Sequence, residues 1–223
     1  MAKSFILVSS YLLLYNLTAA AGWAWLLIAC VRNIAAGANF GSLWNETESM
    51  LKIVQTMACL EIVHSALGFV KSPVFTTFMQ VFSRVWTLWA VMDIAPEAQT
   101  SIFFLLAATS WSLVEVPRYL FYALDSVHLC PKVLKWLRYS LFAVLYPTGI
   151  TGELGCMYHA GLNLYKKDRF RYIPIKTMPQ FEISLLILII LVALTYIPGS
   201  PKMYMHMVKA RSKALYGDKK KKT

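Results

Sequence analysis

Tyr146 and Glu153 lie seven residues apart in the apolar stretch LYPTGITGE, residues 145–153, and each side chain can carry a proton. On a helix, seven residues make about two turns, so both side chains would project from one face, with roughly 10 Å of rise between them. A phenol and a carboxylic acid facing one apolar cavity suit general acid–base catalysis. From spacing alone, however, the favoured interpretation is structural: a packing kink at Pro147, with Glu153 paired to Arg118.

Other ionisable side chains also interrupt the apolar segments, where a charge is costly unless it is paired. Several of them recur at three- and four-residue spacing, which places them on shared helical faces. We expect most of them to neutralise one another where the helices meet, which implies a polar, partly hydrated interior. The set comprises Glu61, His64, Arg84, Glu115, Arg118, Tyr122, Arg138 and Glu153.

The composition is that of a membrane protein. Of 223 residues, 58% are hydrophobic and only 15% are charged, well below the roughly 25% of an average soluble domain. The net charge of +11 is concentrated after Tyr165, and the aromatic residues lie in apolar runs, so no nucleic-acid partner is expected. The four cysteines are far apart without a CxxC pattern, so we predict no metal site, disulfide framework or cofactor.

The apolar segments predict an all-α integral membrane protein, a bundle of six transmembrane helices within a membrane domain of residues 1–207. A basic cytosolic tail, residues 208–223, would follow. A polar loop is expected at 33–49, and Asn16 is expected to donate a hydrogen bond to another helix. The predicted spans are residues 5–31, 50–70, 74–92, 100–124, 133–162 and about 181–207.

Lysine and arginine favour the cytosolic side of a membrane, and their distribution predicts that both termini are cytosolic. The basic segment 166–176 is the exception, because six spans place it on the opposite side. Residues 220–223, KKKT, fit a dilysine address for retrieval to the endoplasmic reticulum. A basic tail that attracts anionic lipid is a compatible interpretation. We therefore expect a multi-pass protein of the endoplasmic reticulum membrane.

Residues 64–72, HSALGFVKS, resemble the phosphatase signature HCxxGxxR. Ser65 stands at the position of the nucleophilic cysteine, and Lys71 at that of the phosphate-binding arginine. A serine without an adjacent base is a poor nucleophile, and lysine lacks the guanidinium fork. The motif would also lie within a span instead of a phosphate-binding loop, so phosphatase activity is not expected.

Five stretches together carry a family resemblance: YLLLYNLTAAAGW, LEIVHSALGFVKSPV, QVFSRVW, WSLVEVPRYLFY and LRYSLFAVLYPTGITGE. Over nearly its whole length the chain resembles the very-long-chain 3-hydroxyacyl-CoA dehydratases, also described as protein tyrosine phosphatase-like proteins, and most nearly their plant PASTICCINO type. The resemblance implies a polytopic enzyme of the endoplasmic reticulum that performs the third step of fatty-acid elongation. It implies that Tyr146 and Glu153 are the catalytic pair, and that the other elongation enzymes are partners.

Dehydration requires a base for the proton on C2 and an acid for the hydroxyl leaving C3. We favour Tyr146 as the base, with Arg118 or Arg138 stabilising its phenolate and a protonated Glu153 as acid. An ionised Glu153 could instead be the base, with Tyr146 as the hydrogen-bond donor. Gly149 and Gly152 would let the substrate approach the helix backbone.

Depth along the predicted fifth span suggests where coenzyme A would lie. Tyr146 lies eleven residues beyond Lys135, which is roughly 16 Å on a helix and comparable with a pantetheine arm. Coenzyme A phosphates are then expected near Lys132, Lys135 and Arg138. Glu61, His64, Glu115 and Tyr122 would support the site. The alternatives are a non-catalytic membrane scaffold with a polar packing core, and a proton-coupled transporter, although no inverted repeat supports the latter.

Overall fold

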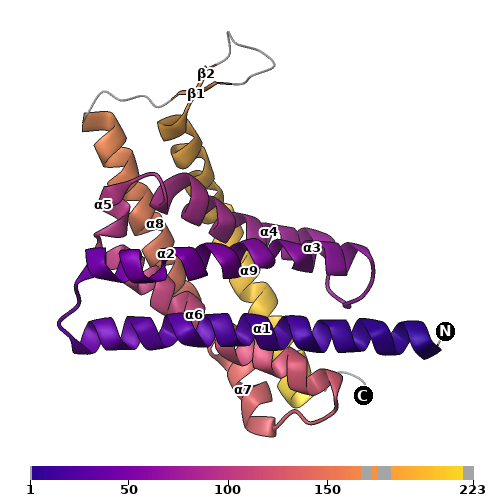
Figure 1. The fold of residues 1–223 in the computed structure, drawn as a ribbon. Coiled ribbons are helices and arrows are strands. Elements are labelled where there is room, and N and C mark those ends of the chain that lie inside the picture. The colour runs from indigo at the N-terminus through magenta and orange to yellow at the C-terminus, as the bar shows by residue number, and fades with distance from the viewer. Residues whose placement is uncertain (1, 167–171, 175–181, 218–223) are drawn as a thin grey trace.

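The computed structural model describes residues 2–166, 172–174 and 182–217, and these are almost entirely helical (Figure 1). One short antiparallel pair, β1 (Tyr172–Pro174) and β2 (Glu182–Ser184), precedes the last helix. The helices are α1 (Ala2–Ala35), α2 (Phe40–Met57), α3 (Cys59–Ala66), α4 (Val74–Trp86), the π-helical η1 (Thr87–Met92), α5 (Pro96–Gln99), α6 (Ile102–Ser126), α7 (Lys132–Ser140), α8 (Phe142–Lys166) and α9 (Leu185–Tyr216).

Helix α6 is the centre of the arrangement, because it packs along α1 and also against α8. Helices α8 and α9 run obliquely across α1 and α2 (Figure 1). Helix α8 packs against α6 and η1, and α9 packs against α8 and α7. The N-terminus of α6 is defined by Ser101, whose hydroxyl accepts a hydrogen bond from the Phe104 amide at 3.3 Å.

Two glycines let α8 approach α6 closely. A Cβ atom on Gly152 would lie 2.6 Å from the backbone nitrogen of Ala107, and one on Gly155 would lie 2.1 Å from the ring of Phe103. Neither position has room for a side chain. The expectation that Gly152 admits substrate to the backbone is therefore wrong, since Ala107 of α6 occupies the space beside Gly152. Gly149 does line a cavity, which is described below.

Large apolar side chains remain exposed along α1 and α9, as expected of helices that contact lipid. They include Leu14 and Ile28 on α1, and Ile187 and Ile197 on α9. By length and composition, segments Leu7–Ala35 and Leu185–Tyr216 can each cross a membrane, and no other helix in the described residues meets the same criterion. These two helices indicate membrane association.

The predicted polar loop at 33–49 is wrong for most of its length. Helix α1 continues to Ala35 and α2 begins at Phe40. Asn39 causes the early start of α2, because its side chain accepts a hydrogen bond from the Ser42 amide at 3.1 Å. Asn33 donates to the carbonyl of Asn39 at 2.8 Å, which holds the short connection together.

Two of the predicted spans are interrupted. The second breaks at Ala58, between α2 and α3. There the Tyr15 hydroxyl donates to the Met57 carbonyl at 3.0 Å. The Glu61 amide, which in a continuous helix would donate to Met57, donates to the Ala58 carbonyl. The fifth breaks at Leu141, which separates the surface helix α7 from α8. No residue of α7 is fully buried, although α7 packs against α6 and α9.

Three other expectations concern the ends and the interior of the helices. Asn16 donates to the Leu12 carbonyl of its own helix at 2.7 Å, so the predicted interhelical bond is wrong. Helix α9 extends through Tyr216, past the predicted start of the tail at 208. Most of the basic segment 166–176 and all of the KKKT sequence lie outside the described residues.

Candidate functional site

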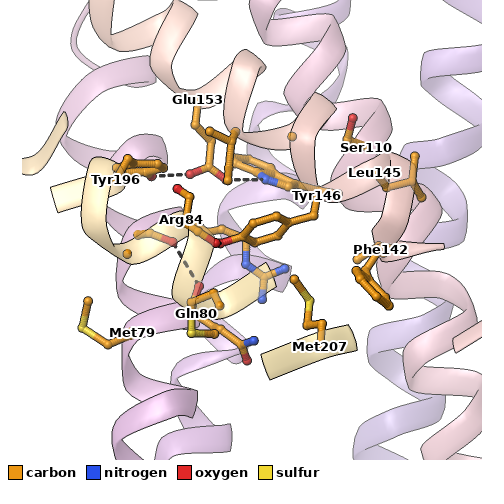
Figure 2. Close-up of a pocket in the computed structure, with 18 of the residues that line it drawn as sticks. Met79, Gln80, Arg84, Ser110, Phe142, Leu145, Tyr146, Glu153, Tyr196 and Met207 are labelled. Atoms are coloured by element: carbon orange, nitrogen blue, oxygen red, sulfur yellow. Dashed lines mark hydrogen bonds between the residues drawn. The ribbon is translucent and has the colours of Figure 1, made fainter. Parts of the chain in front are cut away.

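Tyr146 and Glu153 line the same cavity, as their seven-residue spacing predicts (Figure 2). The cavity has a volume of about 220 Å³ and lies between α4, α6, α8 and α9. Both side chains project from one face of α8, with Gly149 between them at the cavity wall. This cavity is the candidate catalytic cavity.

Glu153 is only 6% exposed, and both of its carboxylate oxygens accept hydrogen bonds. The indole N–H of Trp111, from α6, donates to Oε1 at 2.9 Å. The hydroxyl of Tyr196, from α9, donates to Oε2 (Figure 2). The carboxylate is thus held by donors on two neighbouring helices. The structural alternative in which Glu153 pairs with Arg118 is wrong.

Tyr146 is partly buried, and its hydroxyl points toward α9. The nearest hydrogen-bonding atom is the Ser200 carbonyl oxygen, 3.5 Å from the phenol oxygen. The ring lies beside that of Tyr204, with 6.2 Å between the ring centroids. Among the described residues, no cation has a recorded hydrogen bond to this phenol.

Four charged side chains form a connected network beside the catalytic cavity. Arg84 of α4 pairs with Glu115 of α6. Arg118 donates to Glu115 at 2.5 Å and also pairs with Glu61 of α3, which accepts a further bond from Tyr119. Two arginines therefore balance two carboxylates inside the protein, which confirms the expected mutual neutralisation for these four groups.

The other residues predicted to support the site lie outside this ion-pair network. The His64 ring nitrogen Nε2 lies 2.9 Å from the Tyr11 hydroxyl. Arg138 donates to the Tyr122 hydroxyl at 2.9 Å. Lys132 and Lys135 are exposed on α7, and neither lines the catalytic cavity.

The phosphatase-like segment spans a helix end. Helix α3 stops at Ala66, so the second half of HSALGFVKS is a turn with Gly68 at a φ of 72°, and the expectation that the motif lies within a span is wrong. The Ser65 hydroxyl donates to the Ser72 carbonyl at 2.6 Å across this turn. That bond occupies the serine at the nucleophile position in a structural role.

A second cavity, of about 480 Å³, adjoins the catalytic cavity. It lies among α1, the turn before α4, α6, α7 and the C-terminal half of α9. We call it the basic cavity, because Lys71, Arg118 and Arg138 line it. Three further residues predicted to support the site also line it: Glu61, His64 and Tyr122.

Two important side chains could not be assigned from the sequence. Trp111 lies in an apolar run with nothing to distinguish its indole N–H from those of the six other tryptophans. Tyr196 offered a weak signal, since with Thr195 it is a polar interruption of ISLLILIILVALTYI. Both are brought to Glu153 only by the packing of α6 and α9 on α8.

Comparisons with known proteins match the chain over most of its length. The family model described as protein tyrosine phosphatase-like protein, PTPLA, matches residues 55–217. The chain is 40% identical to the very-long-chain (3R)-3-hydroxyacyl-CoA dehydratase hpo-8 of Caenorhabditis elegans, over 96% of this chain and 99% of that protein.

Two further relatives carry the same dehydratase name. Identity is 38% to the human very-long-chain (3R)-3-hydroxyacyl-CoA dehydratase 2, over 94% of this chain and 82% of that protein. Identity is 35% to the very-long-chain (3R)-3-hydroxyacyl-CoA dehydratase PASTICCINO 2 of Arabidopsis thaliana, over 94% of this chain and 95% of that protein. The plant relative is thus among the matches, at lower identity than the nematode and human ones. No solved structure matches the chain significantly.

Proposed function

The chain belongs to the protein tyrosine phosphatase-like family, and we propose that it dehydrates very-long-chain (3R)-3-hydroxyacyl-CoA to the trans-2-enoyl-CoA, the third step of fatty-acid elongation. It is a 3-hydroxyacyl-CoA dehydratase, a hydro-lyase, like its relatives at 35–40% identity. The observation that supports the proposed catalytic pair is the convergence of Tyr146 and Glu153 on one cavity. The carboxylate there is held in place by two donors.

Glu153 is the base in this proposal. Both of its oxygens accept hydrogen bonds, and these donors offset part of the cost that burial imposes on the ionised carboxylate. An indole N–H can only donate, so Oε1 must act as an acceptor. A carboxylate has about four acceptor sites, so Glu153 retains a lone pair for the C2 proton.

Tyr146 is the hydrogen-bond donor and proton source. Its closest polar neighbour is a carbonyl oxygen, which favours a neutral phenol over a phenolate. The arginines along the cavity wall already have other partners: Arg84 and Arg118 bind carboxylates, and Arg138 binds Tyr122. The geometry therefore favours this allocation over Tyr146 as base.

The proposed proton transfers balance. Glu153 removes the C2 proton, the C2–C3 double bond forms as the C3–oxygen bond breaks, and the leaving hydroxyl takes the Tyr146 proton to become water. Transfer of the proton from Glu153 to the Tyr146 phenolate then restores the starting state. No other reactant is required.

We also propose that the helical segments 2–35, 40–66, 74–92, 102–126, 142–166 and 185–216 form six spans in the endoplasmic reticulum membrane. Each contains at least about 19 residues, or roughly 28 Å of helix, close to a hydrocarbon core. The ion-pair network lowers the cost of placing Arg84, Glu115 and Arg118 inside the bundle. Both termini would be cytosolic, with membrane lipid and the other elongation-cycle enzymes as partners.

The proposal is tested with purified full-length protein and a long-chain 3-hydroxyacyl-CoA, by following the formation of the trans-2-enoyl product. We expect Tyr146→Phe and Glu153→Gln each to reduce kcat at least 100-fold, because general acid–base groups contribute typically 10²–10⁴-fold. Tyr204→Phe is the matched control, since its ring lies beside Tyr146. Normal turnover in both catalytic variants would refute the pair. Absence of turnover in the natural protein would favour a scaffold.

A further inference from the structure

The catalytic and basic cavities share part of one wall, so they lie directly beside each other. The basic cavity also reaches Lys71, on the turn before α4, and His206, on the second half of α9. The side chains common to both cavities are Gln80, Arg118, Arg138, Phe142 and Met207.

Cationic side chains exceed acidic ones around the basic cavity. Lys71, Arg118 and Arg138 face Glu61 and Asp125, which leaves an excess of one cation with histidines counted as neutral. Because Arg118 and Glu61 pair with each other, the cations available to a ligand are Lys71 and Arg138. An anionic ligand is the chemical class that this lining favours.

Arg138 stands at the shared wall with unused hydrogen-bonding capacity. One terminal nitrogen donates to the Tyr122 hydroxyl, and the guanidinium lies 5.4 Å from the ring centroids of Tyr122 and Tyr139. Its Nε, although buried, has no hydrogen-bond partner within the part of the chain that the structure describes. A buried N–H without an acceptor is costly, so the side chain is held ready for an oxygen atom of a ligand.

We propose that the basic cavity is the coenzyme A compartment of the enzyme, an inference that rests on the proposed dehydratase function. The Nε of Arg138 donates to a carbonyl oxygen of the pantetheine arm as the arm passes between the cavities. Lys71 binds a coenzyme A phosphate, and the thioester lies in the catalytic cavity near Tyr146.

The dimensions agree with this placement. Tyr146 follows Arg138 by eight residues, or about 12 Å at the helical rise, although the break at Leu141 alters this separation somewhat. Pantetheine is about as long as four extended residues, roughly 14 Å. The arm can therefore pass Arg138 while its sulfur reaches the catalytic pair.

This placement moves the phosphates away from their expected position near Lys132 and Lys135. Those two side chains are exposed on α7 and line neither cavity. Lys71 lines the basic cavity, although it is 61 residues before Lys132 in the chain. The two positions make opposite predictions for a kinetic experiment.

The experiment compares two substrates with the same acyl group, a 3-hydroxyacyl-CoA and the corresponding 3-hydroxyacyl-pantetheine, which lacks the phosphates. With full-length protein, Lys71→Met should raise KM for the CoA ester and Ki for free CoA about tenfold, as loss of one charge-assisted bond predicts. It should leave kcat and the KM of the pantetheine ester within twofold. Lys166→Met, an exposed lysine at the far end of α8, is the matched control.

Arg138→Met should raise KM for both substrates, because it removes a contact to the shared arm. Arg138→Lys should restore little of the loss, since a lysine ammonium cannot reproduce the fixed Nε–H. The melting temperature of each variant shows whether it remains folded.

Two kinetic results would overturn the coenzyme A compartment. One is an unchanged Ki for free CoA in Lys71→Met. The other is a tenfold rise in the Ki for free CoA in the Lys132→Met/Lys135→Met double variant, which would place the phosphates at α7. Calorimetric titration of Glu153→Gln with free CoA separates this inference from the catalytic proposal: retained binding that Lys71→Met weakens about tenfold supports the compartment, whether or not Glu153 is catalytic. Absence of binding overturns it.

Discussion

Replacing Trp111 with phenylalanine tests whether the position of Glu153 matters for dehydration. The indole N–H donates to Glu153 Oε1 at 2.9 Å, and it is one of two donors to that carboxylate. Phenylalanine keeps an aromatic ring but cannot donate. Glu153 would then be held by Tyr196 alone, and its second oxygen would be free to turn away from the C2 proton.

The structure sets the size of the expected effect. Glu153 is 6% exposed and Trp111 is 4% exposed, so water does not readily replace the lost donor. A hydrogen bond to a charged group contributes roughly 1.5–3 kcal/mol. If all of this is lost from the transition state, kcat falls about 10- to 100-fold, at 1.36 kcal/mol for each factor of ten. KM should change little, because the carboxylate acts on C2 and not on the coenzyme A portion.

The assay is steady-state formation of the enoyl product by the natural protein, Trp111→Phe, Tyr196→Phe and the double variant. We expect the double variant to lose less than the sum of the two single losses if the donors act as one unit. Trp23→Phe is the matched control. It is a 1% exposed tryptophan whose indole N–H has no partner among the described residues, so it reports packing loss alone.

Full kcat in Trp111→Phe, together with inactive Glu153→Gln, would refute the positioning role of Trp111. Equal losses in Trp111→Phe and Trp23→Phe would also refute it, because the effect would then come from packing.

Three further predictions concern stability and topology. Gly152→Ala should lower the free energy of unfolding by about 1–3 kcal/mol, because its Cβ would lie 2.6 Å from the backbone of α6; Gly199→Ala, with nothing within 4 Å, should be neutral in the same thermal-unfolding assay. Arg84→Met should lower the free energy of unfolding by about 3–5 kcal/mol, since it leaves the Glu115 carboxylate, which is 3% exposed, with one partner fewer. The exposed ion pair of Arg32 with Glu46 should contribute less than about 1 kcal/mol. Cys130, on the turn before α7, should react with an impermeant maleimide added to sealed microsomes; labelling only after permeabilisation would invert the proposed topology.

Local features of this protein could be predicted from short stretches of its sequence. Hydrophobic runs indicated where most of the long helices would lie, since backbone hydrogen bonding and apolar burial act over short stretches of chain. The spacing of Tyr146 and Glu153 placed both on one face of α8, because helical geometry is the same wherever a helix forms. Breaks at single residues, such as Ala58, were not predictable, since a side chain from α1 takes the carbonyl at that point.

Which side chains meet depends on how the helices pack together. Glu153 is bonded to Trp111 and Tyr196, which are 42 and 43 residues away in opposite directions along the chain. Lys71 lines the basic cavity, and the lysines of α7 do not. Such choices depend on how whole helices cross, and that depends on contacts such as the one between Gly152 and α6, which local sequence patterns do not record.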